Sequence, residues 1–208
     1  MEQNLIITWH GHSCFSVTYD QFTFVIDPYE DNSVPGLVPL SLFADEVYVT
    51  HNHSDHNYTK AVTIRDNSRT SPFTLTRIPC AHDDNEGQKR GMSDILLFER
   101  EGLRLAHLGD IGEVLSDDKL EVLKGLDAVM IPVGGYYTID AQEAKNLIDQ
   151  IRPRVVIPMH YRTERIGLEE ISHLDDFLTR VNDAVFYDNS SVIINKDTPP
   201  QTAILPYE

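Results

Sequence analysis

Three histidines and one aspartate fall within six residues, directly after an apolar segment: His51, His53, Asp55 and His56. In an extended segment, side chains two positions apart point the same way, so His51 and His53 can bind one metal ion. Asp55 and His56 then face a second position nearby. A single histidine would favour an inert polar loop, but four candidate ligands at this spacing predict a metal site.

The ligand types in this cluster indicate the metal and the kind of site. Imidazole combined with carboxylate suits zinc, and it also suits manganese or iron. A structural zinc site more often uses thiolates and closes its coordination shell, whereas no cysteine lies near residues 51–56. We therefore predict an open site that keeps room for water.

Three further candidate ligands each follow an apolar, strand-like segment. They are His82 after residues 73–81, Asp110 after residues 103–108, and His160 after residues 155–158. Alone, each would be an ordinary loop or capping residue. Because all of them stand at strand ends, they can converge on one face of a layered protein. Three other histidines, His10, His12 and His107, lie in or beside strands and are expected to be buried or to support the ligands.

Hairpin-like strands come first and strand–helix alternation follows, which predicts an α/β protein with two packed sheets and helices outside. The length of 208 residues fits one domain spanning residues 1–208. Strands are expected over residues 5–9, 13–18, 22–26, 46–50, 73–81, 95–100, 103–108, 128–132, 155–158, 184–187 and 191–194, the last two closing the chain. Helices are expected over residues 117–124, 140–151 and 168–181.

The charge of the chain bears on its partners. Acidic residues number 33 against 17 lysines and arginines, giving a net charge of −16. Such a surface repels nucleic acid and anionic membranes, so a small-molecule substrate is expected. The two cysteines are expected to be reduced and buried. We see neither a signal peptide nor an apolar run long enough to span a bilayer, which favours a cytoplasmic protein. The sequence is also compatible with a homo-oligomer.

The run His51-x-His53-x-Asp55-His56 resembles the signature of the metallo-β-lactamase superfamily. The later motifs of that superfamily also occur in order, at His82, Asp110 and His160. The resemblance covers most of the chain, from about Trp9 to His160. Within the superfamily, the sequence is most similar to the branch of ascorbate-phosphate lactonases and related zinc-dependent hydrolases. The segments that carry this likeness are residues 11–15, 108–110, 132–135 and 157–161.

The resemblance implies an αβ/βα four-layer sandwich, the metallo-β-lactamase fold, with two divalent metal ions in a groove between its halves. One ion would take His51, His53 and His82, the other would take Asp55, His56 and His160, and Asp110 would bridge them. Asp27 matches an early aspartate of the family that supports the ligands by hydrogen bonding. On local grounds alone, Asp27 is equally well a turn residue before Pro28.

The function expected from this site is metal-dependent hydrolysis. A hydroxide bridging the metals would attack an ester, lactone or phosphoester of a small molecule, with Asp55 orienting the hydroxide and passing its proton on. His53 argues against the flavo-diiron reductases, which carry a glutamate there, and Asp110 argues against the β-lactamases. Tyr136, Tyr161 and Arg162 either orient the substrate or simply pack at the rim. The alternative is a non-catalytic or regulatory metal-binding protein on the same fold.

Overall fold

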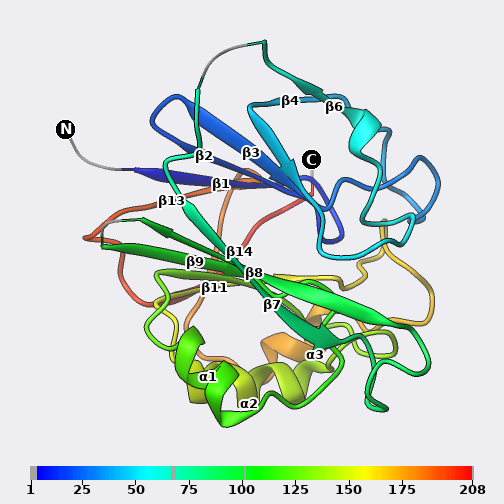
Figure 1. Ribbon diagram of the computed structural model, residues 1–208. Helices are drawn as coiled ribbons and strands as arrows, with labels where there is room; N and C mark the ends of the chain where they lie inside the picture. Colours follow the sequence, from blue (N-terminus) through cyan, green and yellow to red (C-terminus); the bar gives the residue numbers. More distant parts are fainter. Residues whose placement is uncertain (1–3, 67–68, 101, 208) are drawn as a thin grey trace.

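Two large β-sheets face each other and form the centre of the protein (Figure 1). A computed structural model describes residues 4–66, 69–100 and 102–207. The first sheet has the strand order β13-β1-β2-β3-β5 and the second has the order β12-β14-β11-β10-β9-β8-β7. The strands of the first sheet are β1 (Leu5–Trp9), β2 (Phe15–Tyr19), β3 (Phe22–Ile26), β5 (Glu46–Tyr48) and β13 (Ser191–Ile194).

The second sheet is antiparallel at one end and parallel at the other. Strands β7 to β9 pair antiparallel, as their hairpin connections predict, whereas β9, β10, β11, β14 and β12 pair parallel. Its strands are β7 (Thr74–Ala81), β8 (Met92–Arg100), β9 (Leu103–His107), β10 (Ala128–Pro132), β11 (Val155–Met159), β12 (Ala184–Phe186) and β14 (Gln201–Ile204). Every residue of β10 and β11 is buried, because parallel strands are covered on both faces.

The hydrophobic core fills the space between the two sheets. Alternate residues of β1 and β2 are fully or nearly fully buried, as expected of strands with one face inward. Phe24 of β3 stacks on Phe98 of β8 at a centroid distance of 4.5 Å, and Phe73 meets Phe24 edge to face. Aromatic contacts of this kind across the sheets fix how the two halves pack.

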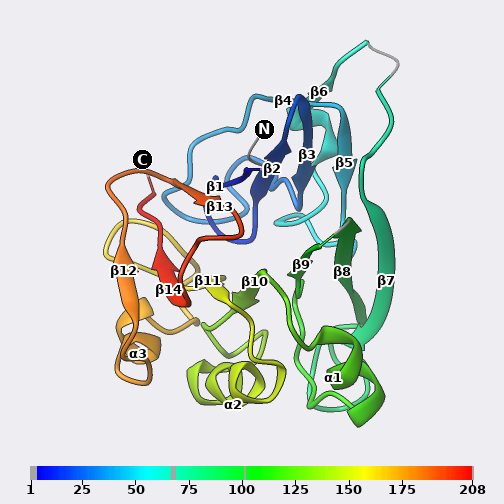
Figure 2. The ribbon, with the colours of Figure 1, turned by 90° about the vertical axis from the view of Figure 1, so that its left-hand side faces the viewer.

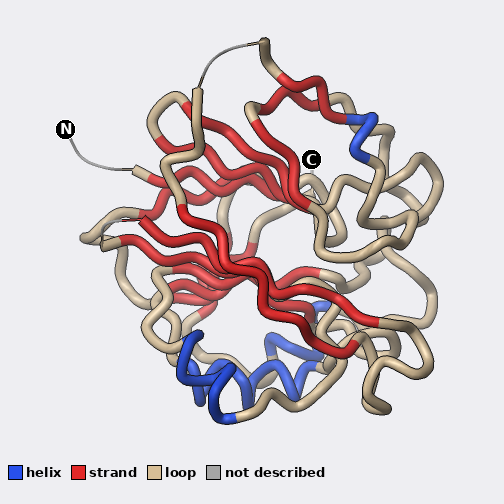
Figure 3. The backbone as a smooth tube through the Cα atoms, in the orientation of Figure 1, coloured by secondary structure: helices blue, strands red, loops and turns tan. Residues whose placement is uncertain are grey.

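Helices cover the outer face of the second sheet (Figures 2 and 3). They are α1 (Asp117–Leu123), α2 (Ala141–Ile151) and α3 (Leu174–Leu178). Helix α2 begins with a capping box in which the Asp140 carboxylate accepts the backbone N–H groups of Gln142 and Glu143. Its buried face is formed by Ala141, Ala144, Leu147 and Ile151.

The outer face of the first sheet has a different cover. Strands β4 (Leu42–Ala44) and β6 (Val62–Ile64) pair parallel, and a 3₁₀ turn, η1 (Thr59–Ala61), precedes β6. Ala44 and Val62 pack with Val25 of β3 in a second small apolar cluster. The α/β sandwich is thus confirmed, and in the part of the chain that is described its fourth layer is this ribbon with its loops.

Two sequence predictions about secondary structure are wrong. The helix expected over residues 168–181 is reduced to α3, because the backbone before it makes tertiary hydrogen bonds. The Ser172 N–H donates to the Gly134 carbonyl and the Ser172 carbonyl accepts from Arg162, so residue 172 cannot be helical. The chain also does not close at β13. Strand β14 follows and inserts between β11 and β12.

The strand ends place the candidate ligands. Asp27 follows β3, His51 lies three residues after β5, and His82 directly follows β7. Asp110 lies three residues after β9, and His160 directly follows β11. The two sheets therefore bring residues far apart in the sequence to one edge of the sandwich. Both cysteines are buried thiols, as predicted.

Candidate metal centre

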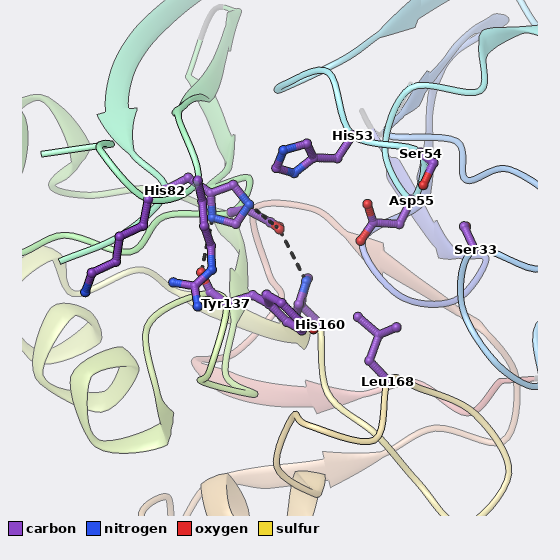
Figure 4. A pocket seen from close by; sticks show the side chains of 11 residues that line it. Ser33, His53, Ser54, Asp55, His82, Tyr137, His160 and Leu168 are labelled. Atoms are coloured by element: carbon purple, nitrogen blue, oxygen red, sulfur yellow. Dashed lines mark hydrogen bonds and ion pairs between the residues drawn. The ribbon is translucent and has the colours of Figure 1, made fainter. Parts of the chain in front are cut away.

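A cavity of about 420 Å³ opens at this edge, a size suited to small molecules. Figure 4 shows His53 and Asp55 from the loop after β5 on one side of the cavity. His82 and His160, from the strand ends of the second sheet, lie across from them. Its lining residues are Ser33, His53, Ser54, Asp55, His82, Lys89, Arg90, Asp110, Tyr137, His160 and Leu168.

Asp110 lies at the centre of the histidines. Its Oδ2 atom is 3.2 Å from Nε2 of His56 and 3.3 Å from Nε2 of both His82 and His160. The Nε2 atom of His51 lies 3.9 Å away. The carboxylate is 2% exposed, so its charge is balanced by these rings alone or by a cation between them.

One group of potential ligands consists of His51, His53 and His82, whose ligand atoms all lie within 4.8 Å of one another. His51 Nε2 and His53 Nδ1 are 2.9 Å apart. His82 Nδ1 donates to the Tyr137 carbonyl at 3.1 Å, which assigns the proton to Nδ1 and leaves the Nε2 lone pair facing the group.

A second group consists of Asp55, His56 and His160, and it also includes His12. His56 Nε2 lies 3.6 Å from Asp55, and His12 Nε2 lies 3.2 Å from the same carboxylate. The rings of His12 and His160 are 4.0 Å apart. Within the described residues, the buried Nε2 atoms of His56 and His160 lie within ion-pair distance of the Asp110 carboxylate but make no hydrogen bond of good geometry, an arrangement that a cation between them would satisfy. These donors therefore fit a metal ion.

Asp27 holds this group from behind. The fully buried carboxylate accepts hydrogen bonds from the Thr50 backbone N–H at 2.7 Å and the Thr50 hydroxyl at 2.6 Å. It also lies 2.9 Å from His56 Nδ1 and orients that ring so that Nε2 faces Asp110. A carboxylate behind a ligating histidine would hold that ring for a metal ion in this way, so the hydrogen bonds of Asp27 reach beyond a turn.

Left-handed backbone conformations concentrate at this edge. His12, Asp27 and His160 have φ values of 50°, 47° and 53°, each just beyond the end of a strand. Non-glycine residues rarely adopt this region, and each instance costs about 1 kcal/mol or more. Such strain is typical of functional sites.

Burial keeps two of the ligand rings neutral. It lowers the pKa of His51 to about 3, and it also lowers the pKa of His82. A neutral imidazole retains the lone pair that a metal needs. His56 is different: burial alone would lower its pKa, but the carboxylates of Asp110, Asp55 and Asp27 outweigh burial and raise it well above the ordinary value.

The raised pKa of His56 predicts pH-dependent metal binding. In the metal-free protein His56 is protonated at neutral pH, so an incoming ion must displace that proton. We expect zinc affinity, measured by chelator competition, to rise about tenfold per pH unit near pH 7.5, above the range of unshifted imidazoles. The stability that protonated His56 gives the metal-free protein is complete below its unfolded pKa of about 6.5 and is lost as pH rises through the raised value. Affinity that does not change with pH would contradict this.

The residues proposed from sequence to contact substrate occupy different places. Tyr161 is 2% exposed and packs on Trp9 at a centroid distance of 5.4 Å, so it belongs to the core. Arg162 is not among the described residues that line the cavity. Tyr136 is exposed, and its neighbour Tyr137 lines the cavity instead.

Two basic residues of the cavity, Lys89 and Arg90, were not anticipated. The signal was present in the sequence, since both belong to the polar stretch that directly follows the ligand candidate His82. His12 was expected only to be buried or supporting, yet it lies within the second group of potential ligands.

The chain is similar to several known proteins. The family model described as beta-lactamase superfamily domain matches residues 6–160. A UPF0173 metal-dependent hydrolase of Thermoplasma acidophilum is 29% identical over 198 residues, covering 77% of this chain and 85% of its own. A UPF0173 protein of Pyrococcus furiosus is 31% identical over 185 residues, covering 76% and 83%.

The same similarity extends to solved structures. A crystal structure from Thermotoga maritima, assigned as a zinc-dependent hydrolase of the metallo-β-lactamase superfamily, superposes with a TM-score of 0.73 at 26% identity. The alignment covers 97% of this chain and 98% of that one. In addition, none of the helices in the described part of the chain is long and apolar enough to cross a membrane.

Proposed function

This chain belongs to the family described as beta-lactamase superfamily domain, and on that basis we propose that it is a metal-dependent hydrolase. The proposed enzyme is dinuclear and acts on an ester, lactone or phosphoester of a small molecule. The single observation that carries the proposal is the position of Asp110. Its carboxylate lies within 3.9 Å of ring nitrogens from both groups of potential ligands, as a bridging ligand would. Relatives of this chain that are named metal-dependent hydrolases support the same class of activity.

The donor set favours zinc, with manganese or iron as alternatives. His51, His53 and His82 would hold one ion, and Asp55, His56 and His160 the other. Neither buried cysteine belongs to either group, so a thiolate-rich structural site is not supported. His12 would add a ligand to the second ion or hydrogen-bond to Asp55, whose carboxylate it approaches at 3.2 Å.

Metal ions held here would lower the pKa of a bound water and stabilise the oxyanion that develops during attack. The protein's own part falls to Asp55. Burial alone would raise the pKa of its carboxyl, but His56 and His12 outweigh burial and hold it well below its usual range. Asp55 is therefore ionised at neutral pH. With a side chain 20% exposed and lining the cavity, it is placed to accept the proton of the attacking water.

Substitution of Asp55 tests the proposal. We expect metal-loaded Asp55→Ala to hydrolyse 4-nitrophenyl acetate and bis(4-nitrophenyl) phosphate about 10²-fold more slowly than the parent, because a general base is lost. His10→Ala is the matched control, since His10 contacts Ser16 and belongs to neither group of ligands. It should keep near-parental turnover.

The same assay decides between the two classes of function. A parent protein that binds metal yet hydrolyses neither substrate would favour the alternative, a non-catalytic or regulatory metal-binding protein. Equal losses in Asp55→Ala and His10→Ala would reject the role given to Asp55. Both reactions would use the same ligands, so the ligand set does not distinguish them. The ratio of the parental rates on the two substrates shows whether the protein favours carboxylic esters or phosphodiesters.

A further inference from the structure

The loop that follows His82 has a defined conformation built around one buried carboxylate. Asp83 is 2% exposed and accepts four backbone N–H groups, from Asn85, Gly87, Lys89 and Arg90, at 2.8 to 3.0 Å. A carboxylate that binds this many amides fixes the course of the chain around it. The loop therefore presents the side chain of Arg90 in one direction.

Arg90 is directed onto the aromatic rim of the cavity. Its guanidinium carbon lies 5.3 Å from the ring centroid of Tyr137 and 5.7 Å from that of Tyr136, and the two rings contact each other edge to face. Tyr137 also accepts the hydrogen bond of His82 through its carbonyl. Tyr137 thus contacts both the candidate ligand His82 and the cation Arg90, and all three line the same cavity.

The charge of Arg90 has no carboxylate partner among the described residues. In this chain of net charge −16, ten of the 17 lysines and arginines form ion pairs with described carboxylates. The pairs include Arg77 with Asp94, Arg104 with Glu99, Lys119 with Glu113, Lys145 with Asp149 and Arg154 with Asp127. Lys89, beside Arg90, is itself paired with Asp84 at 2.5 Å. Arg90 is therefore the cation of the cavity wall that is free to bind an anion.

We propose that Arg90 binds an anionic group of the substrate, a carboxylate or a phosphate that is separate from the bond to be cleaved. The guanidinium offers paired N–H donors that match either oxyanion, and the tyrosine rings hold its plane without competing for those donors. This inference rests on the proposed function for the position of the reacting bond. The inference narrows the substrate class from small esters in general to esters that carry an additional carboxylate or phosphate group.

Matched substrates test this proposal. One pair is mono-4-nitrophenyl terephthalate and its methyl ester, which share the leaving group and differ in one negative charge that cannot reach its own ester. The 4-nitrophenyl ester of 4-phosphonobenzoate replaces the carboxylate by a phosphonate, so it shows which oxyanion is preferred. We expect the parent to favour one of the charged esters over the neutral one by about 10-fold or more in kcat/KM.

In Arg90→Gln that preference should disappear, mainly through a higher KM, while the neutral ester is hydrolysed at close to the parental rate. Arg90→Lys should recover part of it, because the charge returns without the fork of donors. The matched control is Arg152→Gln, which removes an exposed arginine at the end of α2, outside the cavity. Its preference should equal that of the parent.

The outcomes separate this inference from the proposed function. Equal kcat/KM for charged and neutral esters in the parent, or equal loss on both esters in Arg90→Gln, would overturn the inference and leave the hydrolase proposal standing. If no ester is hydrolysed, the hydrolase proposal fails, and calorimetric titration of succinate and inorganic phosphate into the zinc-loaded protein decides the inference. Weaker binding by Arg90→Gln supports it, and unchanged binding overturns it.

Discussion

Asp110→Asn is expected to lower turnover by about 10³-fold and to release metal from the protein. The substitution keeps the size of the side chain but replaces an anion by an amide at the point where both groups of potential ligands meet. Burial alone would raise the pKa of Asp110, but His160 and His56 outweigh burial and hold it well below its usual range. At neutral pH the parent therefore offers a full negative charge to a cation, and the variant offers none.

Elemental mass spectrometry on protein purified without chelator or affinity tag checks this expectation. The parent should carry about two ions per chain and Asp110→Asn fewer than one, because a shared ligand is lost. Asp149→Asn is the control, since it removes the same charge from an exposed ion pair with Lys145 on α2. It should change neither metal content nor turnover. Two ions retained in Asp110→Asn would show that Asp110 does not bridge the site.

The candidate ligands could be predicted from sequence because each follows a strand. Apolar segments reveal strands by composition, and the ends of neighbouring strands lie at one edge of a sheet, so His82, Asp110 and His160 were located together with the 51–56 cluster. Local pattern was sufficient here because the backbone of the sheets sets where these candidate ligands stand, while contacts such as that of Asp27 with His56 orient their rings.

The elements that the sequence did not reveal depend on tertiary contacts. Residues 168–173 have helical periodicity, but the backbone hydrogen bonds of Ser172 to Gly134 and Arg162 override it. Strand β14, with the sequence Gln201–Ile204, is too short and too polar at its start to be recognised before β11 and β12 are known to flank it. Ribbon β4–β6 pairs segments that are far apart along the chain.

The residues that line the cavity from loops were harder to predict. Sequence proximity to His160 suggested Tyr161 and Arg162, but Tyr161 is buried against Trp9 and Arg162 is not among the described residues that line the cavity. Arg90 reaches the cavity because Asp83 folds its loop, and that folding is a property of four backbone amides which no side-chain pattern displays. Candidate ligands at strand ends can therefore be predicted from sequence, whereas the loop residues that line the cavity become evident only in the folded structure.

Gly134→Ala is expected to lower the free energy of unfolding by about 3 kcal/mol and to disrupt the metal centre, although the residue carries no chemistry. A Cβ atom at Gly134 would lie 2.1 Å from the backbone carbonyl oxygen of His160 and 3.1 Å from Ile171 Cβ. Carbon and oxygen atoms cannot approach this closely, so the backbone of one segment must move. Since His160 is a candidate ligand at a strained position, its ring would move with the displaced carbonyl.

Urea denaturation of the metal-free protein isolates the packing effect from metal binding, which itself stabilises the folded state. Gly125→Ala is the matched control, because its added Cβ meets no atom within 4 Å and only the left-handed φ of 70° opposes it. That variant should lose about 1 kcal/mol and keep its metal. A Gly134→Ala protein that unfolds like Gly125→Ala and retains both ions would mean that the segment after β10, with Gly134, can move away from the segment after β11, with His160, at little cost. The close approach of Gly134 to His160 would then not be what positions this ligand.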